Sequence, residues 1–119
     1  MKKLTRALAV AGVLLLGPRA TAQEVPAVIG TLPNRAGGEI VFTTRVTRSC
    51  SKQEAIFAYI RDEGGKISLA GCWRIDGEQV FVFWDDGDVY SYPLNTIRFT
   101  EEWIRYSEAK DRGRQGAKT

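Results

Sequence analysis

Histidine is absent from this 119-residue chain, and cysteine occurs only twice. Without histidine the chain lacks the side chain that most often serves as a general base or a zinc ligand near neutral pH. The motifs G-x-S-x-G, H-E-x-x-H and the P-loop are absent as well. We therefore expect a protein that is not an enzyme and that has no metal site and no cofactor.

Long apolar runs are also scarce, and the one near the start, Ala7 to Gly17, covers only 11 residues. A membrane-spanning helix needs about 20. The run precedes an A-x-A cleavage site that ends at Ala22, and it follows three basic residues, Lys2, Lys3 and Arg6. This pattern is typical of a signal peptide over residues 1–22. We expect the mature chain to start near Gln23, to act in the periplasm or outside the cell, and to have no stable membrane insertion after cleavage.

The basic charge of the chain comes from this leader. Seventeen basic residues oppose 14 acidic ones in the whole sequence, but Lys2, Lys3, Arg6 and Arg19 belong to residues 1–22. The mature chain keeps 13 basic and 14 acidic residues, a net charge of about −1. A nucleic-acid-binding surface concentrates positive charge to release counterions from phosphates. The composition therefore argues against nucleic acid as a partner.

The two cysteines, Cys50 and Cys72, both lie in the exported part, where oxidising conditions allow a disulfide to persist. The alternative is a reactive or metal-binding pair of thiols. It has less support, because the chain has no C-x-x-C motif and no histidine to complete a zinc site. We predict a Cys50–Cys72 disulfide that stabilises a small domain.

Composition divides the mature chain into three parts. Residues 23–38 are rich in proline and glycine and predict an extended arm, of which Val25 to Ile29 could lie on the core. Residues 39–106 form the predicted β-domain. Residues 107–119 are polar and charged, which predicts a disordered tail.

Short β-rich runs separated by turn residues fill the β-domain, which predicts a mainly β fold, a small antiparallel meander or an SH3-like barrel or roll of five to six strands. The runs are 39–46, 55–61, 66–75, 78–84 and 89–93. The segment Ile97 to Tyr106 fits either a strand or a helix. Asp76-Gly77 and Asp86-Gly87 predict two-residue hairpin turns.

These turns set an expected register that places apolar residues on both faces of the sheet. One face carries Leu69, Trp73, Val80, Val82, Trp84 and Val89; the other carries Cys72, Phe81, Phe83, Tyr90 and Tyr92. Two arrangements satisfy this pattern. Either the second face is covered by the arm and the last segment, or it stays partly open as a ligand surface.

The open arrangement gives the candidate binding site. Its predicted residues are Phe81, Phe83, Tyr90 and Tyr92, with Asp86 and Asp88 at the rim. The acidic loop that contains these aspartates could bind a cation. However, three acids around a glycine are more typical of a turn, and a calcium loop spreads its ligands over about 12 residues.

The segment GCWRIDGEQVFVFWDDGDVYSYPLNTIRF, residues 71–99, resembles the later strands of SH3-like barrels, with Tyr92 to Ile97 similar to the turn before the last strand. The stretches GGEIVFTT, GCW and W-x-D-G-D-V with a following Y-P are similar to those of small uncharacterised exported proteins of proteobacteria and their phages. The first resemblance implies an architecture. Neither implies an activity.

The sequence thus predicts an exported binding module with an unknown protein or a cell-envelope glycan as its partner. One alternative is an inhibitor of a cell-wall hydrolase such as lysozyme, because the acidic balance of residues 23–106 would favour encounter with a cationic enzyme. Another is a structural or assembly factor, which could be phage-encoded.

Overall fold

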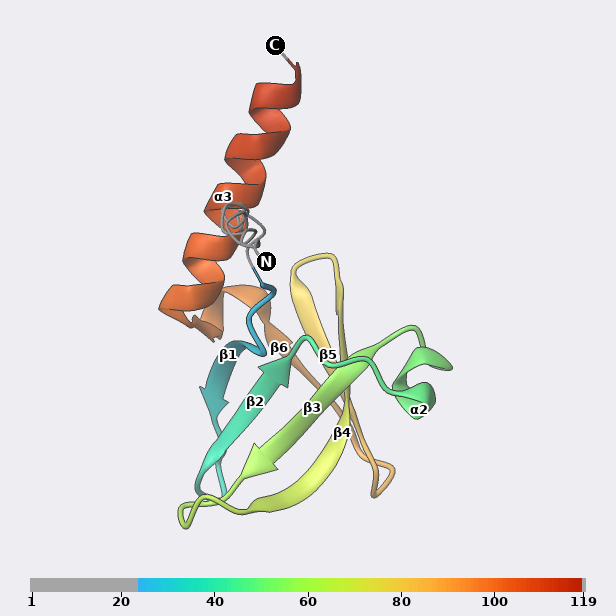
Figure 1. Cartoon of the computed structure of the whole chain (residues 1–119). Coiled ribbons are helices and arrows are strands. Elements are labelled where there is room, and N and C mark those ends of the chain that lie inside the picture. Colours follow the sequence, from blue (N-terminus) through green and yellow to red (C-terminus); the bar gives the residue numbers. More distant parts are fainter. Residues whose placement is uncertain (1–23, 119) are drawn as a thin grey trace, which may run out of the picture.

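The computed structural model describes residues 24–118, with side chains as far as Arg114 (Figure 1). The predicted signal peptide, residues 1–22, lies outside the described residues. Within the described part, no helix is both long enough and apolar enough to span a membrane.

The fold is one curled antiparallel sheet that forms a half-barrel, so the mainly β prediction is confirmed. The strand order is β6-β5-β4-β3-β2-β1-β7. The described residues form seven strands where five to six were expected: β1 (Val28–Pro33), β2 (Glu39–Thr43), β3 (Ile56–Arg61), β4 (Ile67–Asp76), β5 (Gln79–Trp84), β6 (Val89–Pro93) and β7 (Arg98–Phe99). The helical segments of this part of the chain are α2 (Arg48–Ser51), the 3-10 helix η2 (Leu94–Thr96) and α3 (Glu101–Lys118).

Strand β1 lies inside the segment that was expected to be an arm. It pairs antiparallel with β2, and its side chains Ile29 and Leu32 are buried in the core. Gly30 and Pro33 interrupt the apolar alternation of this strand, and the register shifts between Val28 and Gly30. A bulged strand of this kind has no clean two-residue period, so its sequence reads as irregular chain.

The core lies on the inner face of the curled sheet. Its buried members come from every strand of the meander except the edge strands β6 and β7: Ile29, Leu32, Ile40, Phe42, Ala58, Trp73, Val80, Val82 and Trp84. After β6 the chain crosses to the opposite edge through η2, where Ile97 is also buried, and β7 then pairs with β1. The indole N–H of Trp73 donates to the carbonyl of Thr43 (3.0 Å), which satisfies this buried donor.

The predicted disulfide is confirmed. Cys50 and Cys72 are bonded, with 5.4 Å between their Cα atoms, and the bridge ties α2 to β4 on the outer face of the sheet. Thr47 caps α2, because its hydroxyl accepts the backbone N–H of Cys50 (3.2 Å). The cysteines form a second buried cluster with Ala55 and the half-buried Phe57. A small part of the outer face is therefore covered by the disulfide loop.

The segment from Ile97 onwards contains both alternatives that its sequence allowed. Arg98–Phe99 form β7, and α3 begins at Glu101. The hydroxyl of Thr100 accepts the N–H of Trp103 (3.0 Å), as an N-cap does, and the indole of Trp103 packs against the core. The helix is thus fixed to the sheet at its first turn.

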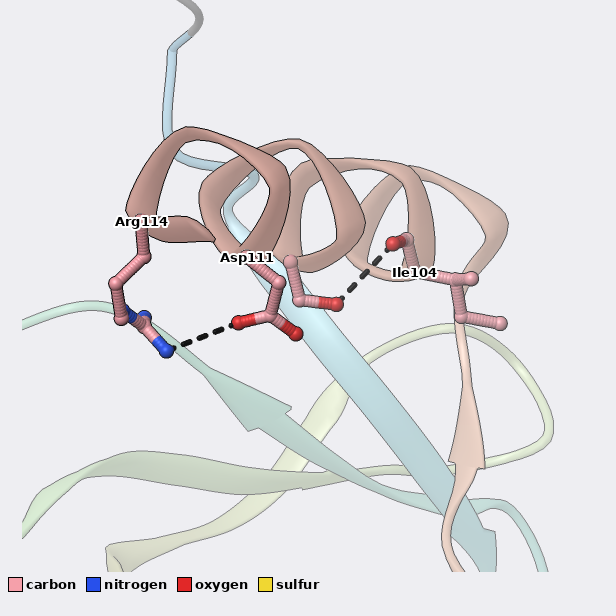
Figure 2. Close-up of polar contacts among 4 residues, drawn as sticks. Ile104, Asp111 and Arg114 are labelled. Atoms are coloured by element: carbon pink, nitrogen blue, oxygen red, sulfur yellow. Dashed lines mark hydrogen bonds and ion pairs between the residues drawn. The ribbon is translucent and has the colours of Figure 1, made fainter. Parts of the chain in front are cut away.

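Residues 107–118 were expected to be disordered, but they continue α3, which projects from the sheet in Figure 1. Local contacts support the helix where it leaves the sheet. The Ser107 hydroxyl donates to the Ile104 carbonyl (3.1 Å), and Figure 2 shows an ion pair between Asp111 and Arg114 (3.1 Å). Composition alone does not show an ion pair of this kind, between side chains three residues apart, and such pairs stabilise exposed helices.

Candidate functional site

The turn between β5 and β6 has three residues, where the sequence predicted two. The N–H of Trp84 donates to the carbonyl of Asp88 (2.8 Å), and the N–H of Gly87 donates to the carbonyl of Trp84 (2.9 Å). Gly87 has a φ of 97°, the left-handed conformation that ends a three-residue hairpin loop. The carboxylate of Asp86 accepts the N–H of Asp88 (3.0 Å), which stabilises this longer loop.

The extra loop residue moves β6 to the other register. Val80 pairs with Tyr92 and Val82 with Tyr90, whereas the expected partners of these tyrosines were Phe81 and Phe83. Because side chains alternate along a strand, a shift of one residue moves every side chain to the opposite face. The expectation that the four aromatic residues share one face is therefore wrong.

The outer face keeps the two phenylalanines. Phe81 and Phe83 are half-buried, Phe83 lies beside Cys72, and the guanidinium of Arg74 stacks over the Phe83 ring (5.0 Å to its centre). The exposed Val89 pairs with Phe83 and belongs to this face, although it was expected on the inner one. The predicted site thus loses Phe81 and Phe83.

The β4–β5 turn also differs from its prediction, but without this consequence. The loop residues are Gly77 and Glu78, and Gly77 has the positive φ of 66° that a type II′ turn requires at its first central position. Trp73 consequently pairs with Val82 rather than Val80. This change moves the pairing by two residues, so each side chain keeps its predicted face.

With Tyr90 and Tyr92 turned inward, the inner face of the half-barrel has an open groove of about 670 Å³. Its floor is apolar and consists of Ile40, Ile60, Leu69 and Trp84. One wall is β6, with Tyr90 and Tyr92, and the other is the β1–β2 loop from Pro33 to Ala36. Figure 1 shows the β1–β2 and β5–β6 loops at the end of the sheet opposite α3.

The tyrosines of the groove stand at the boundary between core and solvent. Tyr90 is 52% exposed, whereas Tyr92 is half-buried and packs against the core. Burial raises the pKa of the Tyr92 phenol, the neighbouring Tyr90 raises it further, and Arg35 on the opposite wall acts against this rise. The Tyr92 hydroxyl is therefore protonated at neutral pH and can donate a hydrogen bond to a ligand.

The predicted rim residues Asp86 and Asp88 do lie at the mouth of the groove. Both are exposed, and Asp86 has the turn-forming role described above. Among residues 24–118, no group of three or more histidine, cysteine, aspartate or glutamate side chains is arranged to hold a metal ion. The acidic loop therefore places negative charge beside the groove and closes the β5–β6 hairpin.

Sequence reasoning therefore found four of the groove residues, namely Tyr90, Tyr92, Asp86 and Asp88. It missed Arg35, because nothing in the irregular segment before β2 indicates that its loop faces the hairpin of β5 and β6. It placed Trp84 in the core, which is correct for most of this side chain (5% exposed), but the same residue also forms part of the groove floor.

No protein-family model matches this chain, and neither a curated protein nor a solved structure shows significant similarity to it. The groove is therefore the feature of the described residues that bears on function.

Proposed function

We propose that this protein is a binding module and that its ligand occupies the groove on the inner face of the half-barrel. The observation that carries the proposal is an open space of about 670 Å³ over an apolar floor, with the aromatic side chains Tyr90 and Tyr92 on one wall. Small-ligand and anchor-residue sites have volumes of about 300–1,000 Å³ and combine an apolar lining with a few polar groups. The Tyr92 hydroxyl, Arg35 and the rim aspartates supply such groups.

A non-catalytic role is part of this proposal. The chain has no histidine, and both of its cysteines are in the disulfide. The carboxylates of Asp86 and Asp88 are exposed at the rim, whereas catalytic acids and bases are commonly tuned by burial or by a close charged partner.

The proposed place of action is the periplasm or the extracellular space. The disulfide supports an oxidising compartment, since such bonds persist there and are rare in the cytosol. The predicted signal peptide at residues 1–22 supports the same location.

The test compares groove and outer-face variants of the oxidised mature chain. Wild type, a Tyr90→Ala/Tyr92→Ala variant and a Phe81→Ala control are immobilised, and each is exposed to a solubilised envelope extract and to purified peptidoglycan fragments. Phe81 is in the same hairpin but on the outer face, so its removal deletes an aromatic ring without changing the groove.

The expected result is at least one component, protein or glycan, that wild type and Phe81→Ala retain and the double-tyrosine variant loses. Circular dichroism verifies that all three proteins are folded. If every retained component binds the double-tyrosine variant as well as it binds wild type, the groove is not the binding site.

A second candidate function is inhibition of a basic cell-wall hydrolase such as lysozyme. The exposed acidic side chains Asp85, Asp86 and Asp88 beside the groove favour it, because opposite charge accelerates encounter with a cationic enzyme. Lysozyme assays at low salt, with micromolar wild type and with Asp88→Asn, provide the test. Inhibition that weakens in Asp88→Asn supports this function, and unchanged lysis excludes it.

A further inference from the structure

Strand β6 is an open edge of the sheet. It is the last strand in the order, and among residues 24–118 it pairs with β5 alone. Most of its residues are exposed. The ladder to β5 shows which backbone groups are engaged. The N–H of Trp84 donates to the carbonyl of Asp88 (2.8 Å), and the N–H of Leu94 donates to the carbonyl of Glu78 (2.8 Å).

These two bonds fix the phase of the whole strand. In an antiparallel pair, residues that bond to the neighbour alternate with residues whose N–H and C=O point away. Asp88, Tyr90, Tyr92 and Leu94 therefore face β5, whereas Val89, Ser91 and Pro93 direct their backbone groups outward.

The outward groups of Val89 and Ser91 are free within the described part of the chain. Both residues are at positions that do not bond to β5, and no other described residue forms a hydrogen bond with their N–H or C=O groups. Pro93 has no N–H, and its carbonyl accepts the hydroxyl of Thr96 (2.6 Å), so the usable edge ends before it. Two residues thus offer two donors and two acceptors in a row.

This edge is also a wall of the groove, because Tyr90, Ser91 and Tyr92 line it. The next strand position beyond β6 consequently lies above the groove, facing the β1–β2 loop. We infer that the ligand is an extended polypeptide segment of a partner protein, which adds to β6 as a further strand and places every second side chain in the groove. This inference rests on the proposed function.

Charge defines the segment further. Asp86 and Asp88 lie exposed where β6 begins, and neither carboxylate forms an ion pair with any residue that the structure describes. A lysine or arginine side chain at that end of the segment would meet these carboxylates and the exposed ring of Tyr90.

The free edge is short, so about four residues of the segment pair with it. An apolar side chain then suits the floor around Leu69 and Trp84.

The probe is a displayed library of random linear 12-residue peptides, selected on the oxidised mature protein. Enriched peptides are synthesised with a fluorophore, and their Kd values are measured by fluorescence anisotropy. The decisive variant is Ser91→Pro. It removes the outward N–H of Ser91 and leaves the β5 ladder intact, which is the situation in which an edge strand tolerates proline. Ser91→Ala is the matched control, because it keeps the N–H.

We expect Ser91→Pro to weaken binding at least tenfold and Ser91→Ala to change it less than twofold. Asp88→Asn should weaken binding severalfold and reduce its dependence on salt, and the enriched peptides should share a basic residue. Methylation of peptide backbone nitrogens should abolish binding at alternate positions only. Circular dichroism of Ser91→Pro verifies its fold, and the methylated peptides test the same pairing on the unaltered protein.

Other results overturn the inference, and they separate it from the proposed function. If Tyr92→Ala abolishes peptide binding but Ser91→Pro and the methylated peptides bind normally, the groove binds peptides without strand addition. If no peptide is selected but peptidoglycan fragments bind in a Tyr92-dependent way, the ligand is a glycan. If light scattering finds a dimer that Ser91→Pro dissociates, a second copy of this chain occupies the edge. If no probe depends on Tyr92, the proposed function fails as well.

Discussion

Replacement of both cysteines in Cys50→Ala/Cys72→Ala should remove a large share of the folding stability. The bridge joins residues 22 positions apart. The chain-entropy relation for a loop of that length gives about 3 kcal/mol at 25 °C. Both side chains are almost fully buried, so loss of the sulfur atoms adds a smaller packing cost. Small domains have total stabilities of about 5–15 kcal/mol, so the variant should unfold at a much lower urea concentration.

The assay is equilibrium urea unfolding followed by tryptophan fluorescence, with and without dithiothreitol. Reductant should destabilise wild type by a similar amount and leave the double variant unchanged. Ser51→Ala is a control on the exposed side of α2 and should change the free energy of unfolding by less than about 0.5 kcal/mol. A difference below about 1 kcal/mol between oxidised wild type and the double variant would refute the reasoning, because the unfolded chain would then gain little freedom from the missing bridge.

Three further predictions concern single residues. A Cβ atom on Gly71 would lie 2.5 Å from the Phe83 carbonyl oxygen. Gly71→Ala should therefore lower the free energy of unfolding, measured in urea, by about 1–3 kcal/mol. The control Gly64→Ala, where a methyl group has room, should leave it nearly unchanged. The raised pKa of Tyr92 means that the folded state holds the phenol proton more tightly than the unfolded state. Its contribution to stability is complete below the unfolded pKa and is lost as pH rises through the folded value, so unfolding at pH 9 and pH 11 should show a smaller drop for Tyr92→Phe than for wild type. Thr100→Ala removes the cap of α3 and should cost about 1 kcal/mol, measured by thermal unfolding; an unchanged midpoint would mean that the hydroxyl does not stabilise the helix.

Local patterns predicted most of the strands and the disulfide. The runs that became β2 to β6 combine apolar alternation with clear turn residues, and both cysteines lie in the part predicted to be exported. Strand β1 could not be found in this way, since Gly30 and Pro33 interrupt its period. Its place in the sheet depends on its pairing with β2 and β7, which are tertiary contacts.

At the candidate site, an error of one residue in the predicted length of the β5–β6 loop changes the predicted face of every β6 side chain. The run Asp85-Asp86-Gly87-Asp88 is compatible with a two-residue and a three-residue loop, and propensity alone does not separate them. The choice decides the face of every β6 side chain. The mistaken loop length placed Tyr90 and Tyr92 with the phenylalanines of the outer face, although the hairpin itself was expected correctly.

Helix α3 projects from the sheet and offers a point of attachment away from the groove. At 1.5 Å per residue its 18 residues extend for about 27 Å. The helix leaves the sheet at the end opposite the β1–β2 and β5–β6 loops (Figure 1), which border the groove. A chain attached to a surface through the end of this helix would hold the groove and the β6 edge outward, at a distance from the point of attachment. Protein immobilised through its C-terminus should therefore keep its ligand site accessible. Coupling through the exposed Lys66, beside the β3–β4 turn, would instead bring the groove end of the molecule against the surface.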